Sequence, residues 1–371
     1  MHRPVRARRR APVVAAKTLA VLSVLTVFLI ASAGIATGKS PLPTPPAQPS
    51  SGLGSQGPCH RTVAVHDNPV DAAQKISVYS PRGAAATPLM GGRCNDAERP
   101  VVVVVHGLLA GLDAQLLGTS RLYSDIIDHY VSTGNVVVFA SWPTDPYNGA
   151  ESVAHQDRAL VHAAKMIPRA DFSRLGFVGH SMGGGAVPHL AQQAVERGWG
   201  SSTLWLFQLA PSFAGGVGTG RITVPAHTRI VVENFDNDNI LDTRIGIEQF
   251  LAYDVPSSSK RHVTVRSDVR SPLSRLDATH LSANSVLTPT DAIKFYGIHR
   301  VGDALQACAA TAQHCDADLS YMGEWSDGRP VRPSIVSRDP VDIGPPADAF
   351  DAFGLNGECE APHNPRVTRC P

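Results

Sequence analysis

Beyond its first 33 residues, the chain has no run of basic side chains. That leading segment carries six basic and no acidic residues, so the remainder has 27 basic against 32 acidic side chains and a net charge of −5. A mildly acidic body without a basic stripe offers no electrostatic footprint for a phosphate backbone. The composition therefore excludes DNA and RNA as expected partners.

Cysteine is also scarce, and its positions exclude two kinds of site. The leading segment has none, which excludes a lipoprotein anchor, and no Cys-x-x-Cys pairs indicate a zinc site. The six cysteines all follow residue 58, and an even number in an exported chain predicts disulfides. Six cysteines allow many pairings. Closeness along the chain favours Cys59 with Cys94, Cys308 with Cys315, and Cys359 with Cys370.

The leading segment has the pattern of an export signal. Basic side chains precede an uncharged run over 18–33, whose apolar core, 19–30, is shorter than the ~20 residues of a bilayer span. Ala31-Ser32-Ala33 provides a small-residue cleavage site. We therefore expect a signal peptide over residues 1–33 and a secreted or otherwise extracytoplasmic protein. The alternative is an uncleaved N-terminal anchor, because the apolar stretch extends to Ala36; it would be the only expected membrane attachment.

Composition divides the rest of the chain into three parts. Residues 34–58 are rich in Pro, Ser and Gly and are predicted to form a flexible linker. Strand-like and helix-like segments alternate over residues 59–315, which indicates one α/β domain with a mostly parallel sheet and helices on both faces. Residues 316–371, rich in Gly and Pro, are predicted to be an extension packed on that domain.

Eight strands are expected in the α/β domain, over residues 60–66, 75–80, 100–106, 135–142, 174–178, 203–209, 229–235 and 262–267. Helical spacing covers residues 119–132, 151–167, 183–197, 242–253 and 291–312. No helix separates the first two strands, so these are expected to pair antiparallel.

The most informative motif is Gly179-His180-Ser181-Met182-Gly183, between an apolar strand and a helix. The two glycines let the chain turn sharply, so that the serine hydroxyl projects freely at the apex. Ser181 is therefore a candidate nucleophile, whereas His180 is expected to pack against or hydrogen-bond the scaffold. A glycine-rich loop with an incidental serine is the alternative.

With eight strands, an antiparallel first pair and this turn after the fifth strand, the chain resembles the α/β-hydrolase superfamily over about residues 60–315. The hexapeptide 179–184 is similar to the serine motif of bacterial lipases, esterases and cutinase-like polyester hydrolases. The resemblance implies the α/β-hydrolase fold, with an eight-stranded, mostly parallel sheet. No large lid domain is expected, because only residues 210–228 separate the sixth and seventh strands, where many lipases insert one.

A serine nucleophile needs a histidine base and a carboxylate that orients it. The superfamily supplies them in the order serine, acid, histidine. The resemblance implies Asp238, after the seventh strand, as the acid, with Asp236 as the alternative, and His280, between the eighth strand and the last helix, as the base. Glu233 falls within the strand, and Asp242 is expected to cap the next helix.

No cofactor or metal is expected. The acidic loop over residues 236–242 lacks the glycine and the distal glutamate of a calcium loop, and the histidines have no metal-ligand spacing.

The tetrahedral intermediate of acyl transfer needs two backbone N–H donors. The resemblance implies Met182, directly after the nucleophile, and Leu108, in the sequence His106-Gly107-Leu108 after the third strand. Many polyester hydrolases have an aromatic residue at the position of Leu108, so the leucine argues against polymer binding by aromatic stacking. The leucines of residues 108–117 favour an acyl chain or an apolar ester.

The leading interpretation is a secreted serine carboxylic ester hydrolase, of esterase or lipase type, that forms an acyl-enzyme on Ser181. Its substrate would be a small-molecule or lipid-like ester. A thioesterase or an acyltransferase would use the same triad, so both remain alternatives. An alternative of another class is a non-catalytic binding protein with this fold, and the presence of all three triad residue types argues against it.

Overall fold

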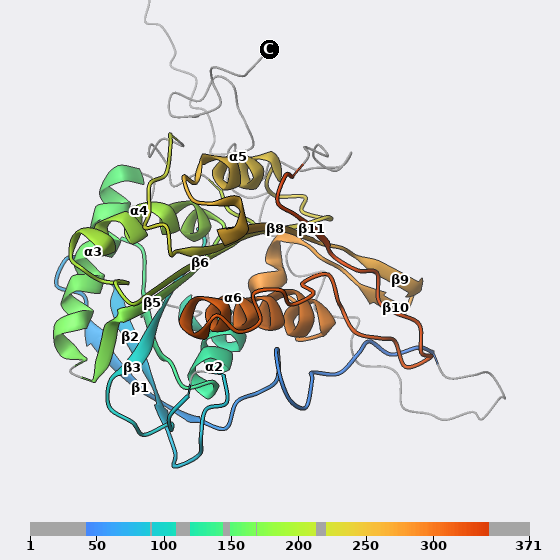
Figure 1. Ribbon diagram of the computed structural model, residues 1–371, viewed down its shortest axis with the longest axis horizontal. Coiled ribbons are helices and arrows are strands. Elements are labelled where there is room, and N and C mark those ends of the chain that lie inside the picture. The colour runs from blue at the N-terminus through green and yellow to red at the C-terminus, as the bar shows by residue number, and fades with distance from the viewer. Residues whose placement is uncertain are drawn as a thin grey trace, which may run out of the picture. The chain divides into compact units, whose positions relative to one another are not determined.

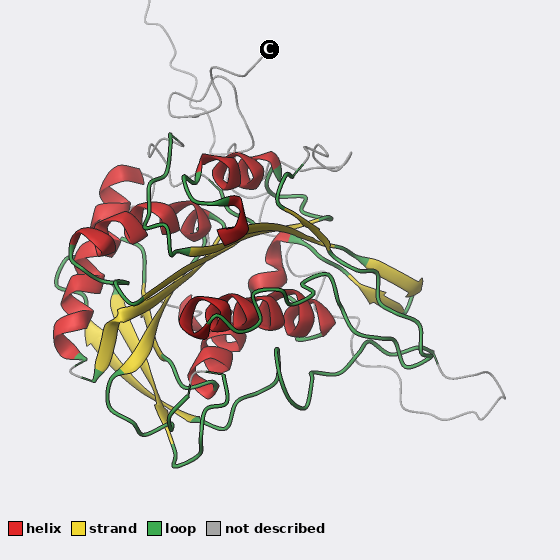
Figure 2. Ribbon diagram, in the orientation of Figure 1, coloured by secondary structure: helices red, strands yellow, loops and turns green. Residues whose placement is uncertain are grey.

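The computed structural model describes residues 42–89, 91–108, 119–143, 149–167, 169–212 and 220–340. Its central feature is a twisted sheet with helices on both faces (Figures 1 and 2). The predicted signal segment lies outside the described residues, as do Cys359, Cys370 and most of the leucine-rich stretch 108–117. Among the helices that are described, none is both long and apolar enough to cross a membrane.

Nine strands of the described chain form the sheet, in the order β1-β2-β4-β3-β5-β6-β7-β8-β11. Their bounds are β1 (His60–Asp67), β2 (Lys75–Arg82), β3 (Arg99–Val105), β4 (Val136–Ala140), β5 (Ala170–His180), β6 (Thr203–Leu209), β7 (Arg229–Phe235), β8 (Lys260–Val265) and β11 (Ile335–Ser337). Strands β3 to β8 pair parallel, and β1 with β2, β2 with β4, and β8 with β11 pair antiparallel. The predicted fold class and the antiparallel first pair are confirmed.

The ninth strand, β11, corrects the expected count of eight. It comes from the segment predicted as an extension and pairs with β8 at the edge of the sheet, with Ile335 opposite Thr264. A three-residue strand is too short for a period-2 pattern to show. The sequence also did not indicate the two-stranded hairpin of β9 (Asp268–Ser271) and β10 (Ser274–Leu276).

The helices form a layer on each face of the sheet. Their bounds are η2 (Thr119–Tyr123), α2 (Ser124–Ser132), α3 (Gly149–Met166), α4 (Met182–Glu196), α5 (Arg244–Ala252), η3 (Ser257–Ser259), η4 (His280–Ala283), the π-helical η5 (Ile293–His299) and α6 (Arg300–Thr311). One face carries α2 and α6, and the other carries α3, α4 and α5 (Figure 1). The central strands of the sheet are therefore buried on both sides, whereas the edge strand β1 is exposed.

The valines of β3 show how a strand packs against helices on both of its faces. Val102 and Val104 belong to the core on the α2–α6 side, whereas Val101, Val103 and Val105 belong to the core on the α3–α4 side. Side chains alternate across a strand, so a strand covered on both faces has an unbroken apolar run rather than an alternating one.

Part of the predicted flexible linker contacts the α/β domain, which corrects that prediction for residues 42–58. Gly54 N donates to Asp303 Oδ2 at 2.7 Å, and Gly57 N donates to Ser132 Oγ at 2.9 Å. Thr44 N donates to Ser326 Oγ at 2.9 Å, in the segment that follows the domain. A Pro/Gly-rich segment has few side chains to bury, but its backbone amides still bind acceptors that a distant part of the chain supplies.

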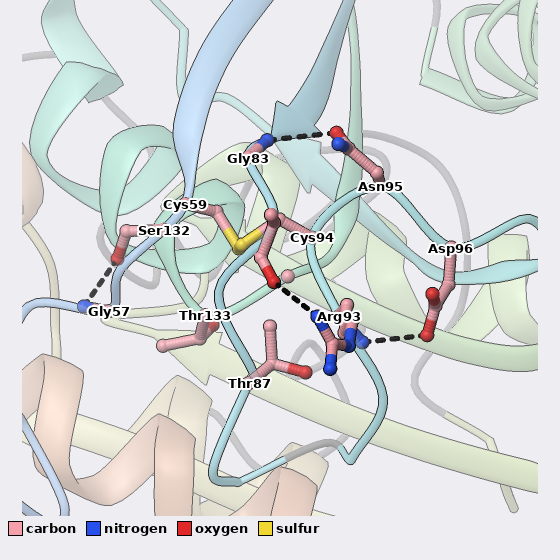
Figure 3. The surroundings of a disulfide bond; sticks show 12 residues. Gly57, Cys59, Gly83, Thr87, Arg93, Cys94, Asn95, Asp96, Ser132 and Thr133 are labelled. Atoms are coloured by element: carbon pink, nitrogen blue, oxygen red, sulfur yellow. Dashed lines mark hydrogen bonds between the residues drawn. A yellow bond between two sulfur atoms is a disulfide. The ribbon is translucent and has the colours of Figure 1, made fainter.

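The described part of the chain contains two disulfides. Cys59 bonds to Cys94, and Cys308 bonds to Cys315, which confirms two of the three predicted pairings. Figure 3 shows the first of them, beside hydrogen bonds from Gly57 N to Ser132 Oγ and from Gly83 N to Asn95 Oδ1. The third predicted pairing, of Cys359 with Cys370, lies outside the described residues.

Candidate active site

Ser181 lies at the turn between β5 and α4, in a backbone conformation that few side chains adopt. Its φ is +56° and its ψ is −124°, a region where a non-glycine residue is strained. Ser181 N donates to Leu209 O at 3.0 Å. Ser181 O accepts hydrogen bonds from Gly185 N at 3.1 Å and from Ser212 N at 2.9 Å. The surrounding strands thus hold a strained turn, and the serine at its apex is partly exposed.

The two glycines of the motif are a steric requirement. A Cβ atom on Gly183 would lie 2.1 Å from Val105 O, and one on Gly179 would lie 2.5 Å from Gly183 O. Both distances are far inside van der Waals contact with backbone atoms. Close approach of α4 to β3 and β5 therefore demands this pattern, which argues against an incidental serine in a glycine-rich loop.

The loop after β3 lies directly against Ser181. A Cβ atom on Gly107 would come within 2.9 Å of Ser181 Cβ. Leu108 follows it and packs, partly buried, against the core on the α3–α4 side. Met182 is the first residue of α4, and first-turn N–H groups have no acceptor within their own helix. The two segments that carry the expected oxyanion donors, Leu108 and Met182, therefore both border Ser181.

Asp238 and His280 form a buried hydrogen-bonded pair. Asp238 Oδ2 lies 2.8 Å from His280 Nδ1, and the two side chains are 2% and 5% exposed. Asp238 Oδ1 accepts hydrogen bonds from the backbone amides of Ile240 and Leu241, both at 2.9 Å. Since one oxygen is held by the loop, the other is fixed in direction toward the imidazole.

Asp236, the alternative acid, has different partners. Its Oδ1 accepts from Ser267 N at 2.8 Å and from Ser267 Oγ at 2.7 Å. Its Oδ2 lies 3.7 Å from Arg332 Nη1. These contacts join the segment after β7 to the segment after β8. Of the two aspartates, Asp238 is the one whose carboxylate meets His280.

His280 lies beside the serine turn through its contact with His180. The Nε2 atom of His180 is 2.8 Å from His280 O, and the centroids of the two imidazole rings are 4.8 Å apart. His180 immediately precedes Ser181 and ends β5. The structure therefore brings three predicted residues from distant parts of the chain, Ser181, Asp238 and His280, to one end of the sheet.

Burial determines the protonation of the other histidines near the serine. Burial, and secondly the neighbouring His280, lowers the pKa of His180 well below its usual value. Burial also lowers the pKa of His106 to about 4. His106 Nε2 accepts from Trp142 N at 3.0 Å, and Trp142 Nε1 donates to His106 O at 2.6 Å. At neutral pH both histidines are uncharged hydrogen-bond partners within the scaffold.

The sequence reasoning missed Tyr123, at the end of η2. Its hydroxyl lies 2.9 Å from Gly107 N and 2.8 Å from His180 Nδ1, and the residue is 1% exposed. A tyrosine within an amphipathic helical pattern has the same sequence signature as a core aromatic residue. No local signal marks it, because its partners come from two other loops.

Two other acids of this region, Glu233 and Asp242, have surroundings that suit a structural role. Glu233 is buried in β7, and burial raises its pKa well above the usual value. Asp242 pairs with Arg244 at 2.5 Å, just before α5. In the part of the chain that the structure describes, no group of three or more His, Cys, Asp or Glu side chains is arranged to hold a metal ion.

Solved structures of low sequence identity are similar to this chain. An esterase B from Lactobacillus rhamnosis is 12% identical, with a TM-score of 0.36 over 53% of this chain and 75% of that protein. A thermostable esterase from Pseudomonas putida is 15% identical, with a TM-score of 0.39 over 69% and 83%. An α/β hydrolase, MGS-M1, from a deep-sea metagenome library is 12% identical, with a TM-score of 0.36 over 54% and 81%.

Neither the protein-family models nor the curated protein sequences gave a match. The fold assignment accordingly depends on the chain's own topology. Its mostly parallel sheet has the order 1-2-4-3-5-6-7-8 before the added edge strand, and a strained Gly-x-Ser-x-Gly turn joins β5 to α4. Helices cover both faces. This chain has the α/β-hydrolase fold.

Proposed function

We propose that this protein is a serine hydrolase that cleaves carboxylic esters through an acyl-enzyme on Ser181. The observation that carries the proposal is the buried contact of 2.8 Å between Asp238 and His280, beside the strained turn of Ser181. A carboxylate on Nδ1 keeps the imidazole in the tautomer whose Nε2 can take a proton. A buried Asp–His pair can also be structural, as between His129 and Asp303, and the pair of Asp238 and His280 differs from it by its place beside Ser181.

In the acylation step, His280 Nε2 removes the proton of the Ser181 hydroxyl as the oxygen attacks the ester carbonyl. The negative charge that develops on the carbonyl oxygen is stabilised by the backbone N–H groups of Met182 and Leu108. The C–O bond to the alcohol then breaks, and the alcohol leaves with the proton from His280. Water repeats the sequence on the acyl-enzyme and releases the acid.

The proposed substrate is an ester with an apolar acyl or alcohol group. Val286 and Leu287 follow η4, the segment that begins with His280, and they are 62% and 45% exposed. Leu108 follows Gly107, which lies against Ser181, and is partly buried against the core on the α3–α4 side. Apolar side chains around a few fixed polar groups are the usual composition of a small-molecule site.

We also propose that the protein acts outside the cytoplasm. The two disulfides support this, since such bonds persist mainly in oxidising compartments. The leading segment, residues 1–33, would then be a signal peptide, or an N-terminal anchor if it is not cleaved.

The test is hydrolysis of p-nitrophenyl esters of increasing acyl length by the protein and by Ser181→Ala. We expect turnover by the wild type and a loss of at least about 10³-fold in kcat/KM for the variant. Ser202→Ala, at an exposed serine after α4, is the matched control and should retain full activity. Equal turnover by wild type and Ser181→Ala would overturn the assignment. Binding of an acyl ligand without turnover of any ester would favour the non-catalytic alternative.

A further inference from the structure

A chain of buried hydrogen bonds runs behind the serine turn. Gly107 N lies 2.9 Å from the Tyr123 hydroxyl, which lies 2.8 Å from His180 Nδ1. His180 Nε2 in turn lies 2.8 Å from the backbone oxygen of His280. This series of hydrogen bonds therefore runs from the oxyanion loop (residues 106–108), which carries the proposed donor Leu108, through His180 to the proposed base His280.

The donors and acceptors along this chain have only one consistent direction. His280 O is an acceptor, so His180 Nε2 must carry the proton. Because burial keeps His180 neutral, its Nδ1 is then an acceptor, and the Tyr123 hydroxyl must donate to it. The Tyr123 oxygen remains free to accept from Gly107 N. Burial raises the pKa of Tyr123 to about 12, so the hydroxyl keeps its proton at neutral pH.

Residues 122–125, around Tyr123, also contact the far end of the histidine loop (residues 280–285). Ser285 N donates to Leu122 O at 2.7 Å, and Asp125 N donates to Ser285 Oγ at 2.8 Å. Residues 122–125 thus contact this loop at residue 285, while Tyr123 reaches its beginning at residue 280 through His180. Residues 122–125 are therefore linked by hydrogen bonds to the oxyanion loop and the histidine loop, and to the serine turn through His180.

We infer that Tyr123 is a positioning residue, which sets the oxyanion loop and His280 in register with Ser181 through His180. The inference depends on the proposed ester hydrolysis and adds to it a residue that does not touch the substrate. Misplacement of reacting groups by about 1 Å costs on the order of 100-fold in rate. Removing the hydroxyl should therefore act on the chemical step more than on substrate binding.

The principal test compares Tyr123→Phe with Tyr130→Phe. Both tyrosines are 1% exposed, but the Tyr130 hydroxyl has no hydrogen-bond partner among the described residues, so its loss breaks no bond. We expect Tyr123→Phe to lower kcat by about 10- to 100-fold with KM changed less than about threefold. Tyr130→Phe should keep the wild-type kcat. Equal kcat values for the two variants would overturn the inference.

A double-mutant cycle tests whether the bonds act as a unit. His180→Gln and Tyr123→Phe each interrupt the same chain, so the double variant should lose little more kcat than the worse single one. Full multiplication of the two single effects would show that they act independently and would contradict the inference. Thermal unfolding of every variant separates misfolding from misplacement.

A third measurement needs no activity and requires only that His180→Gln folds. In wild-type protein with ¹⁵N-labelled histidine, the NMR shifts of His180, assigned by their loss in His180→Gln, should show the Nε2–H tautomer. The Nδ1–H tautomer would leave His180 Nε2 without a proton to donate to His280 O, so the chain would be broken at this bond and the inference overturned. The two proposals fail separately. Inactive wild type with the Nε2–H tautomer removes the proposed ester hydrolysis, whereas active wild type with an unaffected Tyr123→Phe variant removes only the role of Tyr123.

Discussion

His280 Nδ1 lies 2.8 Å from Asp238 Oδ2, and the other oxygen of Asp238 is held by the backbone amides of Ile240 and Leu241. The backbone of its own loop therefore orients the carboxylate of Asp238 toward the histidine. A carboxylate that is fixed in this way can hold an imidazole in one tautomer without rearrangement during the reaction.

This arrangement predicts a large difference between two neighbouring aspartates. Asp238→Asn should lower kcat by about 10⁴-fold, because the amide favours the wrong tautomer of His280. Asp236→Asn removes the negative charge but keeps an oxygen that can accept from Ser267, so it should lower kcat less than about tenfold. Steady-state kinetics on a p-nitrophenyl ester measures both. A larger loss for Asp236→Asn would make Asp236 the triad acid.

Gly107 should not tolerate even one added carbon. In Gly107→Ala the new Cβ would lie 2.9 Å from Ser181 Cβ, so the oxyanion loop has to move away from the serine. We expect kcat to fall by about 100-fold. Gly220→Ala is the control, since among the described residues no atom would lie within 4 Å of its Cβ. Equal activity of the two variants would show that the loop can shift without cost.

Glu233 should make stability depend on pH. Burial raises its pKa in the folded state, so its stabilising effect is complete below the unfolded value and is lost as pH rises toward the folded value. Glu233→Gln removes this dependence. Relative to wild type, its free energy of unfolding should improve by about 1.4 kcal/mol per pH unit above roughly pH 4.5, up to the folded pKa.

Urea unfolding of wild type and Glu233→Gln between pH 4 and pH 8 checks this prediction. Glu196→Gln, at an exposed position of α4, should show a stability difference that hardly changes with pH. A constant difference for Glu233→Gln would mean that the folded protein ionises Glu233 as readily as the unfolded chain.

The two disulfides should differ in their contribution to stability. The bond between Cys59 and Cys94 spans 35 residues and that between Cys308 and Cys315 spans 7. Closing the longer loop removes more entropy from the unfolded chain, so replacing its cysteines with serine should cost about 4 kcal/mol, against about 2 kcal/mol for the shorter one. Chemical unfolding of the two double variants measures the difference, and the reverse order would point to effects in the folded state.

The elements that could be predicted are those with strong local patterns. The continuous valines of β3 and the apolar run before Ser181 indicate buried parallel strands, because a strand covered on both faces has no polar positions. The short β11 and the contacts of residues 42–58 could not be predicted. Both depend on acceptors or strand edges that other parts of the chain provide.

For the site, motif and chain order were sufficient to nominate Ser181, Asp238 and His280. Chain order alone could not exclude Asp236 as the triad acid, since two acids two residues apart in one loop have the same sequence context. The tertiary structure separates them by their partners, His280 for one and Ser267 for the other.

The amino-acid sequence by itself determined the fold class and the strained turn at Ser181, because hydrophobic period and glycine spacing are local properties, and it favoured the two disulfides that the structure contains. Only the tertiary structure decided which aspartate meets His280 and that Tyr123 joins Gly107 to His180. Those contacts connect residues 16 to 57 positions apart, and their directions are set by how β3, β5, β7, η2 and η4 pack together rather than by any pattern along the chain.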